Sequence, residues 1–484
     1  MLFNSLEFLL FFPIVTLSYF ILPSRFRWIL LLIASYVFYM FWNPIYIVLI
    51  IFSTLVDYIA GLMMGKYPLK SIQRKWYLGL SLFSNLGLLF LFKYFNFFAD
   101  IWANIVNSDF DALSLILPMG ISFYTFQTLS YSIDVYKGEK TAEKHLGYFA
   151  LYVSFFPQLV AGPIERSTRL LPQLRNPHPY DYSRTVEGLK RMTWGFFKKV
   201  VIADNLAIAV NHVYGNVESM SGLTLLIATI FFAFQIYNDF SGYSDIAIGT
   251  AKILGVDLME NFRQPYFATS IRDFWARWHI SLSTWFRDYV YIPLGGSRKS
   301  RFRMFFNVFI VFVVSGLWHG AALTFVIWGA LHGIFYIIEA LSLKVRDGFW
   351  KNIKRQDSNI KQLSRWFITM AVVLVSWVFF RAETINDAII VIEVIINSIL
   401  DLSILQNAYQ SLVNTQIGRI RLYVVTASIL VLLLNHYLIE FRSKNIFNIF
   451  SIKPKLQWAV YYVIIFAIII FGEFGQAEFI YFQF

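Results

Sequence analysis

The stretch MFFNVFIVFVVSGLWHGAALTFVIWGALHGIFYII, residues 304–338, decides the fold class. It contains no Asp, Glu, Lys or Arg, and its polar interruptions are small or uncharged side chains. A helix needs about 20 predominantly apolar residues to cross roughly 30 Å of hydrocarbon. A run of this length and composition therefore predicts helical structure inside a membrane.

The rest of the chain repeats this pattern. Of its 484 residues, 58% are hydrophobic and only 14% are charged, which is typical of an integral membrane protein and argues against a soluble fold. We predict an all-α polytopic fold with about ten to twelve spans and some re-entrant or interfacial helices, because Gly and Pro interrupt several runs. The plainest spans are residues 78–92, 366–380, 422–439 and 458–471.

The sequence favours a single integral membrane domain over residues 1–484, with three parts that differ in polar content. Residues 1–136 are hydrophobic hairpins, which predicts a scaffold. In residues 146–340, Gly, Pro, Arg, Asp, Trp and His accumulate within apolar stretches, and ionisable groups at membrane depth tend to mark functional cavities. Residues 366–484 return to plain spans. The middle part is therefore the predicted catalytic core.

The net charge of +12 comes from Lys and Arg residues that sit between apolar segments. This is the positive-inside pattern of membrane proteins, so the charge does not indicate a nucleic-acid partner. Basic loops alternate with the charge-poor turn at 42–44 and the acidic loop at 107–111, which predicts an N-terminus outside the cytoplasm. The basic segments 344–365 and 442–455 are then predicted to face the cytoplasm.

Two further features of the sequence narrow the class of protein. Residues 1–12 carry no basic n-region, and Pro13 and Pro23 offer no small-residue cleavage site, so we predict a retained first span rather than a signal peptide. The chain has no cysteine, which excludes disulfides, thiolate metal sites and a covalent thioester intermediate.

His319 stands within the long apolar stretch, in Trp318-His319-Gly320, and is the first candidate for catalysis. Burial favours the neutral imidazole, which accepts a proton near neutral pH. Gly316 and Gly320 allow a substrate or another backbone to approach closely. These are the properties of a general base for a hydroxyl nucleophile. The alternative is a core histidine that is hydrogen-bonded across helices.

His279 lies in a segment of mixed charged and aromatic character, residues 272–288. We predict one amphipathic helix here, because helical spacing puts Trp275 and Trp278 on one stripe. One interpretation is an interfacial helix whose tryptophans lie at the level of the lipid headgroups. The other is a helix that folds inward and brings His279 near His319.

His332 follows His319 by thirteen residues, so on one straight helix the two side chains would not share a face. We predict a supporting role for it. A metal site is not indicated, because neither an H-E-x-x-H motif nor a Cys/His cluster occurs. A Ser-His-Asp triad is not indicated either, because the sequence has no G-x-S-x-G elbow.

Two further segments place polar groups after apolar runs. Residues 156–166 contain two prolines and end with Glu165 next to Arg166. Residues 237–245, YNDFSGYSD, insert two carboxylates and several hydroxyls. Each segment is either a plain loop or the lining of a polar pocket. The density of polar groups favours lining for the second, with these candidates: Asn238, Asp239, Ser241 and Asp245.

These motifs resemble the membrane-bound O-acyltransferase superfamily, and within it the bacterial branch of alginate and peptidoglycan O-acetylation membrane proteins. The resemblance covers nearly the whole chain and rests on the order and density of the motifs rather than on any one of them. The segments that carry it are MLFNS (1–5), GISFYTFQ (120–127), AGPI (161–164), NDFSGYSD (238–245), NFRQPY (261–266), FWARWHISLS (274–283), WHG (318–320) and FIYFQF (479–484).

The resemblance implies a role for each histidine. In such proteins the histidine of Trp-His-Gly is regarded as the catalytic base, which corresponds to His319 here. The histidine of Arg-Trp-His is the second active-site residue, His279, and His332 matches a further histidine of the bacterial branch. Trp318 precedes His319 and Trp278 precedes His279, and both tryptophans are expected to support or line the site. The implied fold is a ring of tilted helices around a central tunnel.

The resemblance also implies a reaction and partners. The expected donor is acetyl-CoA approaching from the cytoplasm, and no cofactor is expected to stay bound. The acetyl group would pass to a periplasmic partner that modifies an exopolysaccharide or peptidoglycan, with the chain embedded in lipid of the bacterial inner membrane. Alternatives are D-alanyl transfer to teichoic acid from a carrier protein, a transporter of the donor or the polysaccharide, and a scaffold for a secretion complex.

Overall fold

The computed structural model describes residues 1–352, 359–398, 405–413, 415, 417–442, 454–474 and 479–480. Within these ranges every regular element is an α-helix or a short 3₁₀- or π-helix, and no strand occurs. The predicted all-α fold is therefore confirmed. Parts of the predicted cytoplasmic segments 344–365 and 442–455, and residues 481–484 of the terminal motif, lie outside the described residues.

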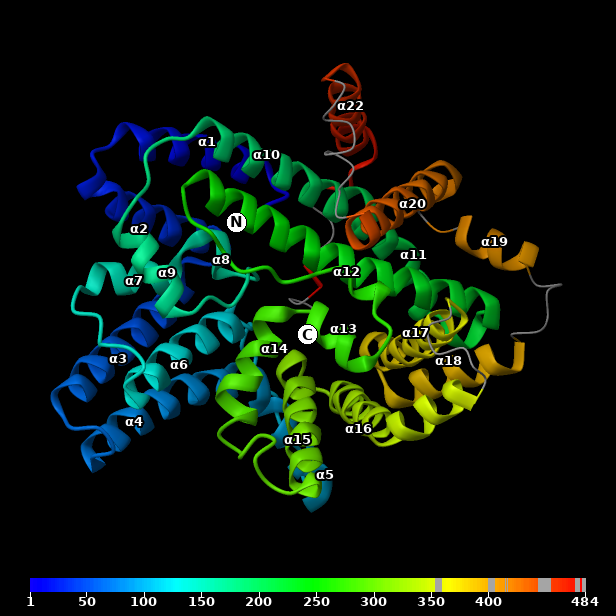
Figure 1. Cartoon of the computed structure of the whole chain (residues 1–484), viewed down its shortest axis with the longest axis horizontal. Coiled ribbons are helices and arrows are strands. Elements are labelled where there is room, and N and C mark those ends of the chain that lie inside the picture. Colours follow the sequence, from blue (N-terminus) through cyan, green and yellow to red (C-terminus); the bar gives the residue numbers. More distant parts are fainter. Residues whose placement is uncertain are drawn as a thin grey trace. The chain divides into compact units, whose positions relative to one another are not determined.

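Figure 1 shows the helices in chain order. The first are α1 (Leu6–Ile21), α2 (Ser24–Met40), α3 (Ile47–Lys66), α4 (Ile72–Leu89), α5 (Phe95–Val106), α6 (Ile121–Lys137), α7 (Leu146–Ser154), α8 (Phe156–Leu159), α9 (Ser167–Arg175), α10 (Tyr182–Phe196) and α11 (Asp204–Tyr214). They are followed by α12 (Gly222–Ile253), α13 (Ile271–Arg277), α14 (Ile280–Phe286), α15 (Arg301–His319), α16 (Leu323–Asn352), α17 (Asn359–Arg381), α18 (Ile385–Ser398), α19 (Leu405–Val413), α20 (Gly418–Arg442) and α22 (Pro454–Phe471). The π-helices η2 (Phe90–Tyr94), η3 (Phe197–Ala203) and η6 (Arg287–Tyr291) each continue an α-helix.

Seven described helical segments are long and apolar enough to cross a membrane. They are Pro44–Lys66, Ile72–Val106, Gly222–Ile253, Arg301–His319, Leu323–Arg346, Asn359–Arg381 and Gly418–Arg442. Leu6–Ile21 and Trp458–Phe471 are shorter apolar helices. The plainest predicted spans all fall within these helices. An apolar run predicts a helix because a backbone in lipid has to satisfy its hydrogen bonds internally.

The chain divides into two compact units. The first unit contains residues 1–192, 243–260 and 284–289, and the second contains 193–242, 261–283 and 290–484. In the first unit, α3, α4 and α6 pack together around the buried carboxylate of Asp57. Asn85 and Ser132 donate hydrogen bonds to it at 2.8 and 2.9 Å, and Ser81 donates a third. The predicted scaffold therefore contains a buried polar network that its hydrophobic sequence did not indicate.

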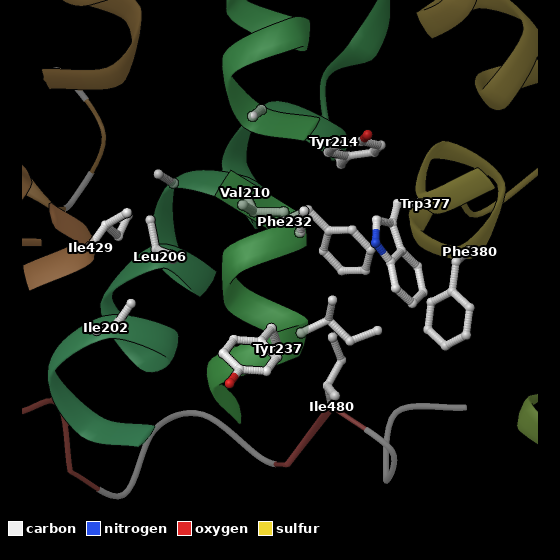
Figure 2. Packing of buried hydrophobic residues seen from close by; sticks show 14 of the residues in the cluster. Ile202, Leu206, Val210, Tyr214, Phe232, Tyr237, Trp377, Phe380, Ile429 and Ile480 are labelled. Atoms are coloured by element: carbon white, nitrogen blue, oxygen red, sulfur yellow. The ribbon is translucent and has the colours of Figure 1, made fainter. Parts of the chain in front are cut away.

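Aromatic side chains dominate the core of the second unit. Figure 2 shows Phe232 and Tyr237 of α12 near Trp377 and Phe380 of α17, with Ile480 close to them. All five side chains are buried. The rings of Phe232 and Trp377 meet edge to face with 6.2 Å between their centroids, an arrangement that stabilises aromatic pairs beyond the area they bury.

The helices α15 and α16 form a tight hairpin in the second unit. They pack along each other (Figure 1), and residues 320–322 between them are not helical. A Cβ added to Gly329 would lie 3.2 Å from the Cα of Gly316, so the two backbones meet where both residues lack side chains. Residues 304–338 therefore form two helices, so the geometry of one straight helix does not apply to His319 and His332.

Candidate active site

His319 is the last residue of α15 and is 2% exposed. Gly320 follows in extended backbone, with φ −159° and ψ 150°, and ends the helix. Three aromatic rings surround the imidazole at centroid distances of 4.9 Å for Trp318, 5.0 Å for Trp328 and 5.5 Å for Phe380. The candidate base is thus buried in an aromatic environment.

His279 lies at a break between two short helices. The helix α13 ends at Arg277, α14 begins at Ile280, and the backbone of His279 is left-handed with φ 42°. The predicted single helix over residues 272–288 is therefore wrong. Trp278 is fully buried within the protein, which favours the alternative in which this segment folds inward.

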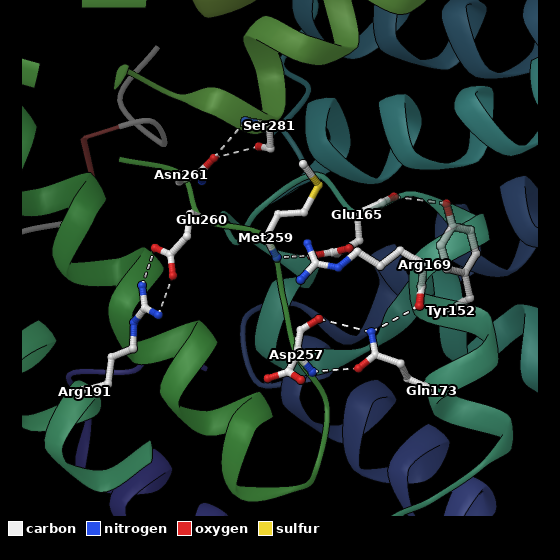
Figure 3. A network of polar contacts seen from close by, with 10 residues as sticks. All are labelled: Tyr152, Glu165, Arg169, Gln173, Arg191, Asp257, Met259, Glu260, Asn261 and Ser281. Carbon is white, nitrogen blue, oxygen red and sulfur yellow. Dashed lines mark hydrogen bonds and ion pairs between the residues drawn. The ribbon is translucent and has the colours of Figure 1, made fainter. Parts of the chain in front are cut away.

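Asn261 explains the break in this segment (Figure 3). Its carbonyl oxygen accepts a hydrogen bond from the Ile280 N–H at 2.9 Å, and its Oδ1 accepts one from the Ser281 hydroxyl at 2.7 Å. These bonds satisfy backbone and side-chain groups at the start of α14 that a continuous helix would have paired internally. A residue far from the motif in sequence therefore sets the conformation of His279.

The structure brings His279 and His319 together in the second unit. Their ring centroids lie 6.5 Å apart, and the ring of Trp318 lies 6.0 Å from His279. Phe240 of α12 packs against His279 at 4.5 Å. Burial lowers the pKa of His279 to about 3, so its imidazole is neutral at physiological pH. At this separation both imidazoles can reach one small reacting group.

His332 lies on α16 and is fully buried. The indole N–H of Trp275 donates to its Nδ1 at 3.3 Å. The ring of Trp328 lies 5.0 Å from His332 and 5.0 Å from His319, so it connects the two histidines. Sequence reasoning gave Trp328 no role, although its position one helical turn before His332 is the signal that could have found it.

Residues 237–245 form a continuous part of α12 and not a loop. The carboxylate of Asp239 pairs with Lys199 at 2.7 Å and accepts the Ile480 N–H at 2.8 Å, and Lys199 also pairs with Asp204 at 2.8 Å. Charges that are paired in this way remain compatible with a buried helix. The loop alternative for this segment is therefore wrong because its carboxylates find cations from other elements.

The other polar candidates of residues 237–245 also make hydrogen bonds or ion pairs. Asn238 Nδ2 donates to the Phe234 carbonyl at 2.7 Å, and Lys198 Nζ donates to Ser241 Oγ at 3.1 Å. In the first unit, Asp245 pairs with Arg191 at 2.9 Å. The member that touches His279 is Phe240, which the sequence analysis missed because only polar residues were taken as candidates. A tunnel-lining role for the four polar residues stays a prediction.

Arginines take part in the polar contacts of the first unit. Arg191 pairs with Glu260 at 2.6 Å (Figure 3). Glu165, at the end of the proline-containing segment, is fully buried and accepts the Met259 N–H, and burial raises the pKa of its carboxyl group to about 7. Arg169 pairs with Glu165 at 4.0 Å. Glu165 is therefore engaged within this unit, and a pocket-lining role for the segment 156–166 stays a prediction.

Comparison with known proteins agrees with the motifs. The model of the membrane-bound O-acyltransferase family matches residues 143–380, which include all three histidines discussed above. A probable alginate O-acetylase of Pseudomonas putida is 42% identical over 394 residues, which is 80% of this chain and 79% of the relative. The peptidoglycan O-acetyltransferase of Helicobacter pylori is 36% identical over 425 residues, which is 81% of this chain and 79% of the relative.

A more distant similarity extends to a third activity. The teichoic acid D-alanyltransferase of Bacillus subtilis is 29% identical over 239 residues, which is 46% of this chain and 58% of the relative. The two acetylating relatives each match most of the chain, and several apolar helices of the structure are long enough to span a bilayer. The chain is therefore a multi-pass membrane enzyme that belongs to the membrane-bound O-acyltransferase family.

Proposed function

We propose that this protein is an O-acetyltransferase of the bacterial inner membrane that takes acetyl groups from cytoplasmic acetyl-CoA for the O-acetylation of an exopolysaccharide or of peptidoglycan. The observation that carries the proposal is the pair of buried imidazoles, His279 and His319, with 6.5 Å between their ring centroids. Relatives named as alginate and peptidoglycan O-acetylating enzymes support the acetyl group and the class of acceptor.

In the proposed reaction His319 acts as the general base. Its neutral imidazole takes the proton from an acceptor hydroxyl as the oxygen attacks the thioester carbonyl. The carbon–sulfur bond then breaks, and the proton passes from His319 to the departing thiolate. The products are an oxygen ester and a free thiol, so atoms and charge balance without a covalent enzyme intermediate.

His279 is proposed to position the donor or the acceptor at His319. Its left-handed backbone and its packing against Phe240 hold the imidazole in one place. Pre-organised groups of this kind lower the barrier because they need no rearrangement during the reaction. Trp318 and Trp328 exclude water from the reacting atoms in this proposal, which limits hydrolysis of the thioester.

The acceptor of the acetyl group is proposed to be a polymer hydroxyl, reached directly or through a second acetyltransferase outside the cytoplasm. The relatives' names include two polymers, so the names alone do not choose between them. The D-alanyl alternative is less favoured because that similarity covers 46% of the chain, against 80% or more for the acetylating relatives.

The test is complementation of a deletion strain with wild type, His319→Ala, or the matched control His212→Ala, which removes an exposed histidine of α11. Ester-linked acetate is measured on exopolysaccharide and on peptidoglycan separately, and ester-linked alanine is measured in parallel. We expect wild type and His212→Ala to restore acetate on one polymer. We expect His319→Ala to lower the transfer rate by about 10²- to 10⁴-fold at equal membrane levels.

Two outcomes would overturn the proposal. If His319→Ala restores acetate fully, His319 is not the base, and a transport or scaffold role takes precedence. If deletion removes ester-linked alanine while acetate esters stay intact, the transferred group is D-alanine instead. Either result is read directly from the hydrolysed esters by mass spectrometry.

A further inference from the structure

A cavity of about 270 Å³ lies in the second unit, away from the histidine pair along the chain. It is formed where the segment before α13 meets the C-terminal half of α16 and the start of α17. The polar residues that line it are Ser270, Arg272, Tyr336, Glu339, Arg346 and Arg365. Three guanidinium groups thus surround one small cavity.

The charged side chains that line this cavity are mostly basic. Its one carboxylate, Glu339, accepts the Ile271 N–H at 2.7 Å and lies 3.7 Å from Arg346. Glu339 is therefore already used by the backbone and by one arginine. Arg272 is exposed and makes no ion pair with any residue in the part of the chain that the structure describes. The lining contains three guanidinium groups and one carboxylate, a composition that favours an anion.

The type of cation narrows the chemistry of the ligand. Arginine presents planar, forked donors that match phosphate and carboxylate oxygens in pairs, and clustered arginines are the usual protein solution for phosphate recognition. The hydroxyls of Ser270 and Tyr336 add neutral groups to the same lining. A volume of about 270 Å³ falls at the lower end of ligand pockets, so it suits one phosphate-bearing end of a ligand rather than a whole nucleotide thioester.

Two helices connect this cavity to the candidate active site. On α16, Glu339 follows His332 by seven residues, which corresponds to a rise of about 10 Å. On the other side, α13 runs from just before Arg272 to just before His279. A ligand that binds in the cavity through its phosphate therefore lies within reach of the histidine site if it carries an extended arm.

We propose that this cavity is a phosphate-binding site that holds the anionic end of a ligand. Two sources share this chemistry: the phosphates of the acyl donor and the headgroup of a membrane phospholipid. Assignment to the donor rests on the proposed function, whereas the phosphate site itself does not. Arg272 is the residue whose loss best separates binding from folding, because it is exposed, whereas Arg346 also supports Glu339.

The first experiment measures binding without catalysis. The full-length protein in detergent is titrated with inorganic pyrophosphate at constant ionic strength, and thermal unfolding is followed for wild type, Arg272→Gln, Arg365→Gln and Lys344→Gln. Lys344 is an exposed residue of α16 that does not line the cavity, so it is the matched control for loss of one charge.

We expect pyrophosphate to raise the Tm of wild type and Lys344→Gln, because a ligand that binds only the folded state stabilises it. We expect its affinity for Arg272→Gln and Arg365→Gln to fall about tenfold, the effect of one charge-assisted hydrogen bond. Equal stabilisation of all four proteins, or of none, would overturn the proposal.

The second experiment identifies the source of the phosphate. If the donor is the ligand, Arg272→Gln raises the KM for acetyl-CoA about tenfold with little change in kcat. If a lipid is the ligand, KM is unchanged, and phosphatidylglycerol added to phosphatidylcholine nanodiscs raises the Tm of wild type but not of Arg272→Gln. Absence of both effects contradicts a phosphate ligand. A positive pyrophosphate titration without any acetyl transfer would leave the site in place and reject only the proposed function.

Discussion

At φ 42° the backbone of His279 occupies the left-handed region, which costs a non-glycine residue about 1–2 kcal/mol. Such strain persists only where surrounding contacts enforce it, and it concentrates at functional sites. Here the contacts are the hydrogen bonds of Asn261 to Ile280 and Ser281. The strain and the burial of the same imidazole are two independent observations at one residue, and both favour a role in the reaction.

Burial of His279 predicts a specific dependence of stability on pH. Its pKa is 6.5 when unfolded and about 3 when folded, so below pH 6.5 the unfolded state binds more protons and the folded state loses stability. Between pH 6.5 and pH 5 this loss amounts to about 2 kcal/mol. We expect His279→Gln to remove this loss. The free energy of unfolding should therefore fall less for the variant than for wild type as the pH is lowered. Denaturant unfolding in detergent at pH 7 and pH 5 measures the difference.

His212→Gln is the control for this measurement, because it removes an exposed histidine. Its unfolding free energy should follow that of wild type at both pH values. If His279→Gln and wild type keep a constant difference from pH 7 to pH 5, then His279 titrates normally and the site is open to water.

At the scale of elements, the α15–α16 hairpin sets the distance between the histidine pair and Trp328. The two backbones approach at Gly316 and Gly329, where added Cβ atoms would clash with main-chain atoms of the opposite helix. Small residues at such a crossing allow close packing of helices in membranes, where the hydrophobic effect does not drive association. Trp328 reaches His319 because this crossing is tight.

Gly329→Ala is therefore expected to destabilise the hairpin. The added methyl group would force the helices apart, and overpacking of this kind costs about 1–3 kcal/mol. We expect a lower Tm and lower transferase activity than for wild type, measured on the same detergent preparation. Gly348→Ala on the same helix is the control, because no atom of the side chains and backbone that the structure describes lies within 4 Å of a Cβ at that position. It should be neutral or slightly stabilising, since alanine favours a helix by up to about 1 kcal/mol.

Individual elements also show how far the sequence could predict the fold. Apolar runs such as residues 366–380 locate helices because lipid leaves the backbone no other arrangement. The breaks at His279 and Gly320 were not predicted, since local periodicity does not report a hydrogen-bond partner such as Asn261. A plain loop stayed open as an alternative for residues 237–245, because Lys199, the cation that pairs with Asp239, lies 40 residues away along the chain. The sequence motifs single out the candidate histidines, whereas the contacts of their aromatic neighbours Phe240 and Trp328 are visible only in the fold.

At the scale of the whole molecule, the distribution of basic residues predicts an orientation of the chain in the membrane. In the N-terminal part, the basic segments 25–27, 66–75 and 137–144 alternate with the charge-poor turn at 42–44 and the acidic loop at 107–111. Positively charged loops are enriched on the cytoplasmic side, so the pattern predicts which ends of the N-terminal helices face the cytoplasm. The start of α17 and the end of α16, where the arginine cavity lies, belong to the predicted cytoplasmic side.

This topology can be tested by cysteine labelling, because the chain has no cysteine of its own. We make three single variants at exposed positions: Gln73→Cys, Ser108→Cys and Gln362→Cys. With the N-terminus outside, a membrane-impermeant maleimide should label Ser108→Cys on intact spheroplasts, and should label the other two only after permeabilisation. The unmodified chain is the control for background.

Each of the labelling outcomes has a distinct meaning. If Gln73→Cys is labelled on intact spheroplasts and Ser108→Cys is not, the orientation of the N-terminal spans is reversed. If only Gln362→Cys departs from expectation, the number of membrane crossings between residues 108 and 362 is even rather than odd. In that case the arginine cavity would face away from cytoplasmic acetyl-CoA, so its phosphate would have to come from lipid of the outer leaflet.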